Sequence, residues 1–154
     1  MHTIDRISIQ APIDRVFEIA TDVERWPDIL PHYRWVRILE RRPDSATVEM
    51  AAWRPFGPPP LRYPAWWISD MRVDHEDRII RYRHVAGITT GMDVRWALRD
   101  GPAGVAVEIR HDWDGPPWPL VGPWTARTLI GPVFVHGIAS RTLAGIRRHA
   151  EAVA

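Results

Sequence analysis

The chain of 154 residues contains no cysteine, no lysine and no asparagine. Without cysteine it forms no disulfide, offers no thiol nucleophile and binds no metal through thiolates. Because all 20 basic residues are arginine, Schiff-base catalysis by lysine and the phosphate-binding lysine of a P-loop are excluded as well. Several classes of chemistry are therefore ruled out before any motif is considered.

The sequence also lacks an excess of charge and a long apolar run. Its 20 basic and 19 acidic residues give a net charge of +1, which argues against a dedicated nucleic-acid-binding protein. No apolar run is long enough to span a bilayer, and the start MHTIDRISIQ lacks the pattern of a secretory signal. We therefore expect a cytoplasmic protein without a membrane span, folded as a single domain over residues 1–154.

Tryptophan and proline are abundant instead, with nine and 15 residues respectively. Tryptophan combines a large apolar surface with one polar N–H group, which suits both a protein core and the wall of a pocket for a flat ligand. Composition alone leaves both roles open.

The first third of the chain predicts one strand and two short helices. Residues 2–10 have the character of a short strand, although no clean apolar face is visible. Pro12 is expected to begin a helix, with Asp22 capping a second one over Val23–Leu30 that Pro31 ends. The first helix has an apolar stripe formed by Ile13, Val16, Phe17 and Ala20.

Alternation of apolar and polar residues then predicts six antiparallel strands. Their expected bounds are Tyr33–Glu40, Thr47–Trp53, Ala65–Val73, Arg78–Val85, Met92–Leu98 and Val105–Trp113. A long helix is expected over Val121–Glu151, kinked at Pro132. Its inner side would carry His136, Ala139, Leu143, Ile146 and Ala150. This order indicates an α+β fold in which the terminal helix fills the concave face of a curved antiparallel sheet.

Several short motifs add a family resemblance to this order. The segment Trp26–Leu30 leads into Tyr33, Trp67-Ile68-Ser69 forms a Trp-x-Ser strand, Trp96 lies in mid-strand, and Ser140-Arg141-Thr142 lies in the last helix. With these motifs the chain resembles the SRPBCC superfamily, also called START or Bet v 1-like, and within it the polyketide aromatase/cyclases (cyclase/dehydrases). The resemblance covers nearly the whole chain and implies a helix-grip fold.

The resemblance implies a deep cavity between the sheet and the terminal helix. In the aromatase/cyclases this cavity holds a poly-β-ketone chain carried by an acyl carrier protein, and the reaction is aldol ring closure followed by dehydration, without metal or cofactor. A hydrophobic small molecule is thus the expected partner, with an acyl carrier protein and a homodimer left open. One position departs from the family: some members have an inward arginine where Met71 stands here, and the neighbouring Arg72 should face the other way.

Aldol closure needs a base, a hydrogen-bond donor for the developing oxyanion and an acid. Alternation places His84 and His111 on apolar strand faces, and His136 on the inner side of the helix. Together with Tyr33 they are the predicted catalytic residues, because imidazole serves as acid or base near neutral pH. Alternatively each histidine is a hydrogen-bonded core residue and Tyr33 caps the junction of helix and strand. The three histidines could also converge as a zinc site, although no HExxH motif is present.

The remaining predictions concern the cavity wall and the outer face of the sheet. The expected ligand-binding residues are Trp26, Trp67, Ser69, Met71, Trp96, Trp113 and Phe134. On the outer face, cross-strand ion pairs are expected among Arg81, Arg83, Arg95, Arg110, Asp93, Glu108 and Asp112. The same face could instead dock an acidic carrier protein.

Two main functions remain at this stage. The first is an aromatase/cyclase-like enzyme, favoured by the inward histidines and the aromatic lining. The second is a non-catalytic binding or carrier protein for a lipid, quinone or steroid-like molecule, which the missing arginine favours. The third hypothesis is a small-molecule-sensing or toxin-like member of the superfamily.

Overall fold

A computed structural model describes residues 1–55, 62–115 and 135–152 of the chain. One strand and three short helical segments precede six further strands and a C-terminal helix, and the order of strands and helices is the one that the sequence predicts. The elements are β1 (His2–Ile9), α1 (Ile13–Thr21), the 3-10 turn η1 (Val23–Arg25), α2 (Trp26–Ile29), β2 (Tyr33–Arg42), β3 (Ser45–Pro55), β4 (Arg62–Asp74), β5 (Ile79–Gly87), β6 (Asp93–Gly101), β7 (Gly104–Asp112) and α4 (His136–Glu151).

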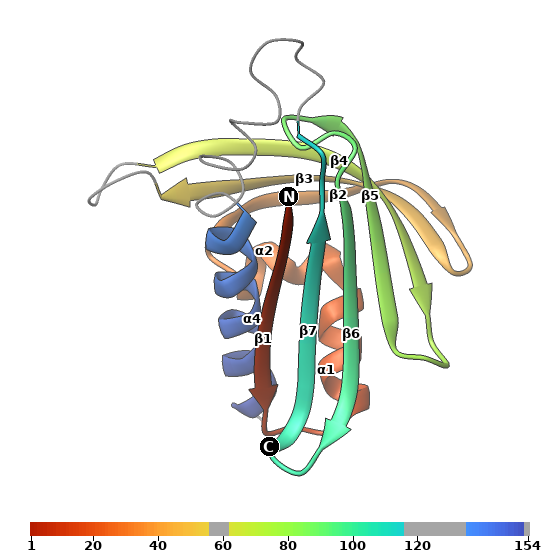
Figure 1. The fold of residues 1–154 in the computed structure, drawn as a ribbon, viewed down its shortest axis with the longest axis vertical. Coiled ribbons are helices and arrows are strands. Elements are labelled where there is room, and N and C mark those ends of the chain that lie inside the picture. The colour runs from red at the N-terminus through yellow and green to blue at the C-terminus, as the bar shows by residue number, and fades with distance from the viewer. Residues whose placement is uncertain (56–61, 116–134, 153–154) are drawn as a thin grey trace.

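The strands form one antiparallel sheet of seven, in the order β1-β7-β6-β5-β4-β3-β2. Strands β1, β7 and β6 run alongside α4, whereas β2, β3 and β4 cross beyond its first turn, so the sheet is strongly bent (Figure 1). Register shifts in the β2–β3 and β4–β5 pairs accompany this bend, as expected where bulges increase twist. The helix-grip fold predicted from the sequence is confirmed.

Helix α4 covers the concave face of the sheet. Ala139, Leu143, Ile146 and Ala150 are buried along it, as the predicted stripe requires. Gly145 allows the helix to approach the chain after α2, because a Cβ there would clash with Leu30 Cδ2. The part of the predicted helix from 121 to 134, including the expected kink, lies outside the described residues.

Three local predictions for the first 30 residues need correction. The predicted helix over Val23–Leu30 is divided into η1 and α2. The side chain of Asp22 makes no capping hydrogen bond, and its backbone N–H instead donates to Glu18 O at the end of α1. Strand β1 does have an inward face, but polar Thr3 and Asp5 share it with isoleucines, which hides the pattern in the sequence.

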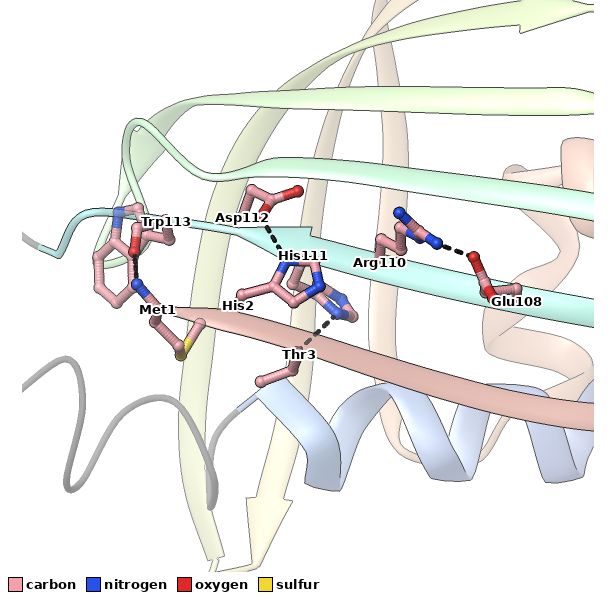
Figure 2. A network of polar contacts seen from close by, with 8 residues as sticks. All are labelled: Met1, His2, Thr3, Glu108, Arg110, His111, Asp112 and Trp113. Carbon is pink, nitrogen blue, oxygen red and sulfur yellow. Dashed lines mark hydrogen bonds and ion pairs between the residues drawn. The ribbon is translucent and has the colours of Figure 1, made fainter.

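Charged side chains cover the outer face of the sheet, but among the described residues the predicted cross-strand pairing is confirmed for Arg83 and Asp93 alone, since Arg110 pairs with Glu108 on its own strand. Arg83 on β5 pairs with Asp93 on β6, and Glu108 on β7 accepts hydrogen bonds from Arg6 Nε at 2.8 Å and Arg110 Nε at 2.7 Å. Asp112 pairs with an imidazole rather than an arginine, since His2 Nδ1 lies 2.6 Å from its Oδ1 (Figure 2). Exposed pairs of this kind contribute little to stability. No helix in the described part of the chain is long and apolar enough to cross a bilayer.

Candidate functional site

A cavity lies between the concave face of the sheet and α4. Its volume is about 80 Å³, enough for several water molecules. Six of the predicted site residues line it: Trp26, Tyr33, Trp67, His84, Trp96 and His111. They come from α2 and five different strands or strand ends, so the cavity depends on the curvature of the whole sheet.

His84 is partly buried on β5 and is held from two sides. Its Nδ1 atom lies 2.6 Å from the hydroxyl oxygen of Thr89, in the turn between β5 and β6. The ring of Trp67 stacks on the imidazole, with centroids 6.0 Å apart and planes at 10°. Burial, followed by the neighbouring His111 and Arg83, lowers the pKa of His84 to about 3. The imidazole is therefore uncharged near neutral pH.

His111 enters the cavity from β7. It stands opposite Thr3 on β1, whose hydroxyl oxygen lies 3.3 Å from its Nδ1 (Figure 2). Burial lowers the pKa of His111 to about 4, although the charge of Asp112 acts in the opposite direction. Val94 on β6 is in register with His111 on one side and with Tyr82 on the other. Two uncharged imidazoles therefore face one cavity from β5 and β7.

Tyr33 lies at the start of β2 and its hydroxyl meets α4. That hydroxyl is 3.5 Å from Thr142 Oγ1, and the Thr142 hydroxyl donates to Ile138 O at 2.9 Å. His32 Nε2 lies 3.0 Å from the same Thr142 oxygen. Burial raises the pKa of Tyr33 above its usual value, so the phenol stays protonated and can donate a hydrogen bond.

Aromatic side chains form much of the apolar wall. Trp26 packs against Tyr33 with ring centroids 5.1 Å apart and planes at 64°, and against Trp96 at 5.8 Å. The indole N–H of Trp26 donates to Ile19 O at 3.0 Å. Because this polar group is already satisfied, Trp26 presents an apolar surface that suits a flat hydrophobic ligand.

Three other predicted site residues lie outside the cavity lining. Ser69 is fully buried on β4, and Met71 is buried beside Ala46 in the β3–β4 pair. The indole N–H of Trp113 donates to Thr90 O at 2.9 Å, so the Trp113 side chain packs on the turn between β5 and β6. Phe134 falls outside the described residues.

His136 is a further such residue, and the expectation that it faces the other two histidines was wrong. It is the first residue of α4, its side chain is 64% exposed, and its Nδ1 pairs with Asp5 on β1. Helical periodicity places it on the inner stripe, and its neighbours Val135 and Ile138 do line the cavity, but its own side chain is directed to Asp5 instead. Within residues 1–55, 62–115 and 135–152, no three histidine or carboxylate side chains are placed to hold a metal ion.

Sequence reasoning missed two polar lining residues of β5 and the turn that follows it, Tyr82 and Thr89. Tyr82 could have been found, because it lies two positions before His84 and therefore on the same strand face. Thr89 could not, because it lies in a turn where alternation gives no information. The other missed lining residues are Met50, Met92, Val94, Ile109, Val135, Ile138, Ala139 and Thr142.

Comparison with known proteins agrees with this architecture. A helix-grip fold around an apolar cavity defines a class of ligand-binding proteins, and residues 9–129 match the family described as polyketide cyclase/dehydrase and lipid transport. The chain belongs to that family. It is similar to an inferred polyketide cyclase of Streptomyces halstedii, with 31% identity over 106 residues that cover 68% of this chain and 93% of the relative. An inferred polyketide cyclase of Streptomyces cyaneus is 28% identical over 114 residues, covering 73% and 72%.

Solved structures show the same fold at low sequence identity. TTHA0849 from Thermus thermophilus has a TM-score of 0.82 at 18% identity, covering 100% of this chain and 99% of its own. The Zhui aromatase/cyclase from Streptomyces sp. R1128 has a TM-score of 0.80 at 24% identity, covering 98% and 93%. A START superfamily protein from Mycobacterium smegmatis has a TM-score of 0.71 at 17% identity, covering 99% of each chain.

Proposed function

We propose that this protein binds a hydrophobic poly-keto or aromatic molecule in its central cavity and closes a ring by aldol condensation and dehydration. The observation that carries the proposal is the entry of two uncharged imidazoles, His84 and His111, into one apolar cavity. The protonated phenol of Tyr33 lines the same space. His136 has no part in the proposal, because its side chain is exposed outside the cavity.

Ring closure begins when an imidazole nitrogen accepts a proton from a carbon between two ketones. The electron pair left on that carbon forms a bond to a second carbonyl carbon of the same chain. The oxygen of that carbonyl becomes an alkoxide, which the Tyr33 hydroxyl stabilises by donating a hydrogen bond. The alkoxide then takes the proton from the imidazolium, so the product is a β-hydroxy ketone and the histidine is neutral again.

Dehydration uses the same groups. An imidazole accepts a proton from the carbon next to the ketone, the hydroxyl group leaves as water with a proton from the imidazolium, and a carbon–carbon double bond remains. One water is lost and no oxidant is needed. The low pKa values make both imidazoles weak bases before the reaction starts. Once an imidazolium and an enolate have formed side by side, the attraction between their opposite charges stabilises both, because the dielectric constant of the site is low.

Turnover of a poly-β-ketone thioester, with the cyclised product measured by mass spectrometry, tests this proposal. We expect His111→Gln and His84→Gln each to lower the rate roughly 10²- to 10⁴-fold, the range for loss of a general acid or base. Arg110→Gln is the matched control, because Arg110 adjoins His111 but lies on the outer face, paired with Glu108. Unchanged turnover in both histidine variants would overturn the acid–base roles.

Met71 favours a second candidate function, a non-catalytic carrier of a lipid, quinone or steroid-like molecule. Some of the aromatase/cyclases that the chain resembles have an inward arginine at this position, whereas Met71 is buried outside the described cavity lining. Native mass spectrometry of protein purified from its own host would identify the bound molecule. A lipid or quinone bound without any turnover of poly-keto thioesters would make the protein a carrier and the histidines polar anchors.

A further inference from the structure

The described side chains that line the cavity carry no formal charge. Among the residues that the structure describes, the lining contains no arginine, aspartate or glutamate. The nearest arginines along β5 are Arg81 and Arg83, which flank Tyr82 in sequence, and both are exposed on the outer face. Burial keeps His84 and His111 neutral at pH 7, as described above. From the described residues of the lining, a ligand in this cavity therefore meets hydroxyl groups, imidazoles and apolar surface, but no cation.

One of these hydroxyl groups is unused. The Tyr82 hydroxyl is buried, and among the described residues it has no hydrogen-bond partner. Burial and the neighbouring Tyr33 raise the pKa of Tyr82, so the group remains a donor at neutral pH. A buried donor without a partner is costly to a folded protein, and an acceptor atom supplied by a ligand would remove that cost.

Flexible neighbours allow a ligand to reach this group. Met50 and Met92 line the cavity together with Tyr82, and methionine side chains adapt readily to the shape of a partner. Tyr82 is also in register with Val94, which is in register with His111. A carbonyl oxygen bound to Tyr82 would therefore lie on the line of cross-strand neighbours that also contains His111, one of the proposed acid–base groups.

We propose that Tyr82 determines ligand specificity by donating a hydrogen bond to a carbonyl oxygen, and that the cavity accepts uncharged ketones, esters or thioesters and rejects carboxylates. The inference rests on the proposed function and specifies its substrate class. A carboxylate would be buried without a compensating cation, which costs several-fold more than burying a neutral carbonyl. An acid group on the substrate must then be masked as an ester or thioester while the chain occupies the cavity.

Three probes of similar shape test the inference by calorimetry at pH 7. Methyl 2-naphthoate offers a neutral carbonyl, 2-naphthoate a carboxylate, and 2-ethylnaphthalene no oxygen. For the unmodified protein we expect 2-naphthoate to bind at least about 100-fold more weakly than the ester. For Tyr82→Phe we expect the ester to bind roughly three- to tenfold more weakly, the usual effect of one hydrogen bond. Binding of 2-ethylnaphthalene should stay within about twofold, which also shows that the variant is folded.

Each contrary result overturns a stated part of the inference. Equal binding of the ester and 2-naphthoate would refute the selection against charge. If Tyr82→Phe weakens binding of the ester and of 2-ethylnaphthalene equally, or weakens neither, the role of Tyr82 is refuted. Both outcomes leave the proposed function intact. Failure of the unmodified protein to bind any probe would contradict both this inference and ligand binding in the cavity.

Discussion

At the scale of single residues, the site depends on how each histidine is held. His84 has one polar partner, the Thr89 hydroxyl at 2.6 Å, and one stacking partner, Trp67. The hydroxyl either donates to Nδ1 or accepts from it, and in each case fixes which nitrogen carries the proton. Thr89 is therefore a positioning residue, because it acts on a ligand only through His84.

Replacement of Thr89 by valine tests this role. The variant keeps the shape but removes the hydroxyl, which leaves a buried ring nitrogen without its partner and should lower the free energy of unfolding by about 1–3 kcal/mol. The ¹⁵N chemical shifts of the His84 ring should change from those of one dominant tautomer to an average of two. Thr89→Ser retains the hydroxyl and should restore both properties. Identical ring shifts in the unmodified protein and the valine variant would show that the contact does not select the tautomer.

At the scale of secondary-structure elements, two glycines have opposite surroundings in the sheet and in its helix. Gly87 ends β5 with φ of +95°, and a Cβ there would clash with the backbone oxygen of Trp66. Only glycine fits this position, which adjoins the register shift between Ile68 and Ser69. Gly137 in α4 is different, because a Cβ there would meet nothing within 4 Å.

Gly87 and Gly137 predict opposite effects of alanine. Gly87→Ala should lower the free energy of unfolding by about 2 kcal/mol or more, because the clash is with backbone and the φ angle is unfavourable. Gly137→Ala should raise it by about 0.5–1 kcal/mol, since alanine restricts the unfolded chain and favours the helix. Urea unfolding of both variants measures the two changes. Equal stability of the two variants would contradict the close approach of β4 and β5.

Elements were predictable from the sequence where one periodicity held throughout. The strands were found because apolar and polar residues alternate along them, and α4 because its buried residues recur at helical spacing. The residue type of Asp22 predicts a cap, but its side chain makes no capping hydrogen bond. Such a bond depends on the local turn geometry, which no sequence pattern encodes. His136 satisfies the helical pattern, but its side chain pairs with Asp5 on β1 instead of entering the cavity, a contact 131 residues apart that no local pattern reveals.

At the scale of the whole molecule, the site required contacts that are distant in sequence. Thr3 meets His111, and Tyr33 meets Thr142, so strands and helices from both ends of the chain close the same cavity. Alternation could show that His84 and His111 face inward, but not that Thr89 and Thr3 would be their partners. The inward direction was predictable from the sequence, whereas the environment that keeps both rings neutral was not.

This shared burial makes the stability of the molecule depend on pH. The pKa values of His84 and His111 in the folded protein, about 3 and about 4, lie below the usual 6.5. Below pH 6.5 the unfolded chain binds protons that the folded protein does not, so stability falls as the pH decreases from about 6.5 toward 4. Between pH 7 and pH 5 each histidine should cost about 1–2 kcal/mol of unfolding free energy.

Chemical denaturation at pH 7 and pH 5 measures this dependence. Asp5 has the opposite effect on the pH dependence, because burial raises the pKa of its carboxyl from the usual 3.8. The protonated carboxyl stabilises the folded protein at low pH, and this contribution is lost as the pH rises above 3.8. Asp5 is the same in every variant compared below, so its contribution cancels from the differences between them. The double variant His84→Gln, His111→Gln should lose much of the difference in unfolding free energy between pH 7 and pH 5. His2→Gln is the control, because it replaces an exposed histidine paired with Asp112, and it should retain that difference. A pH dependence that is the same in the double variant would mean that these two rings are not held neutral by burial, and the proposed acid–base chemistry would lose its physical basis.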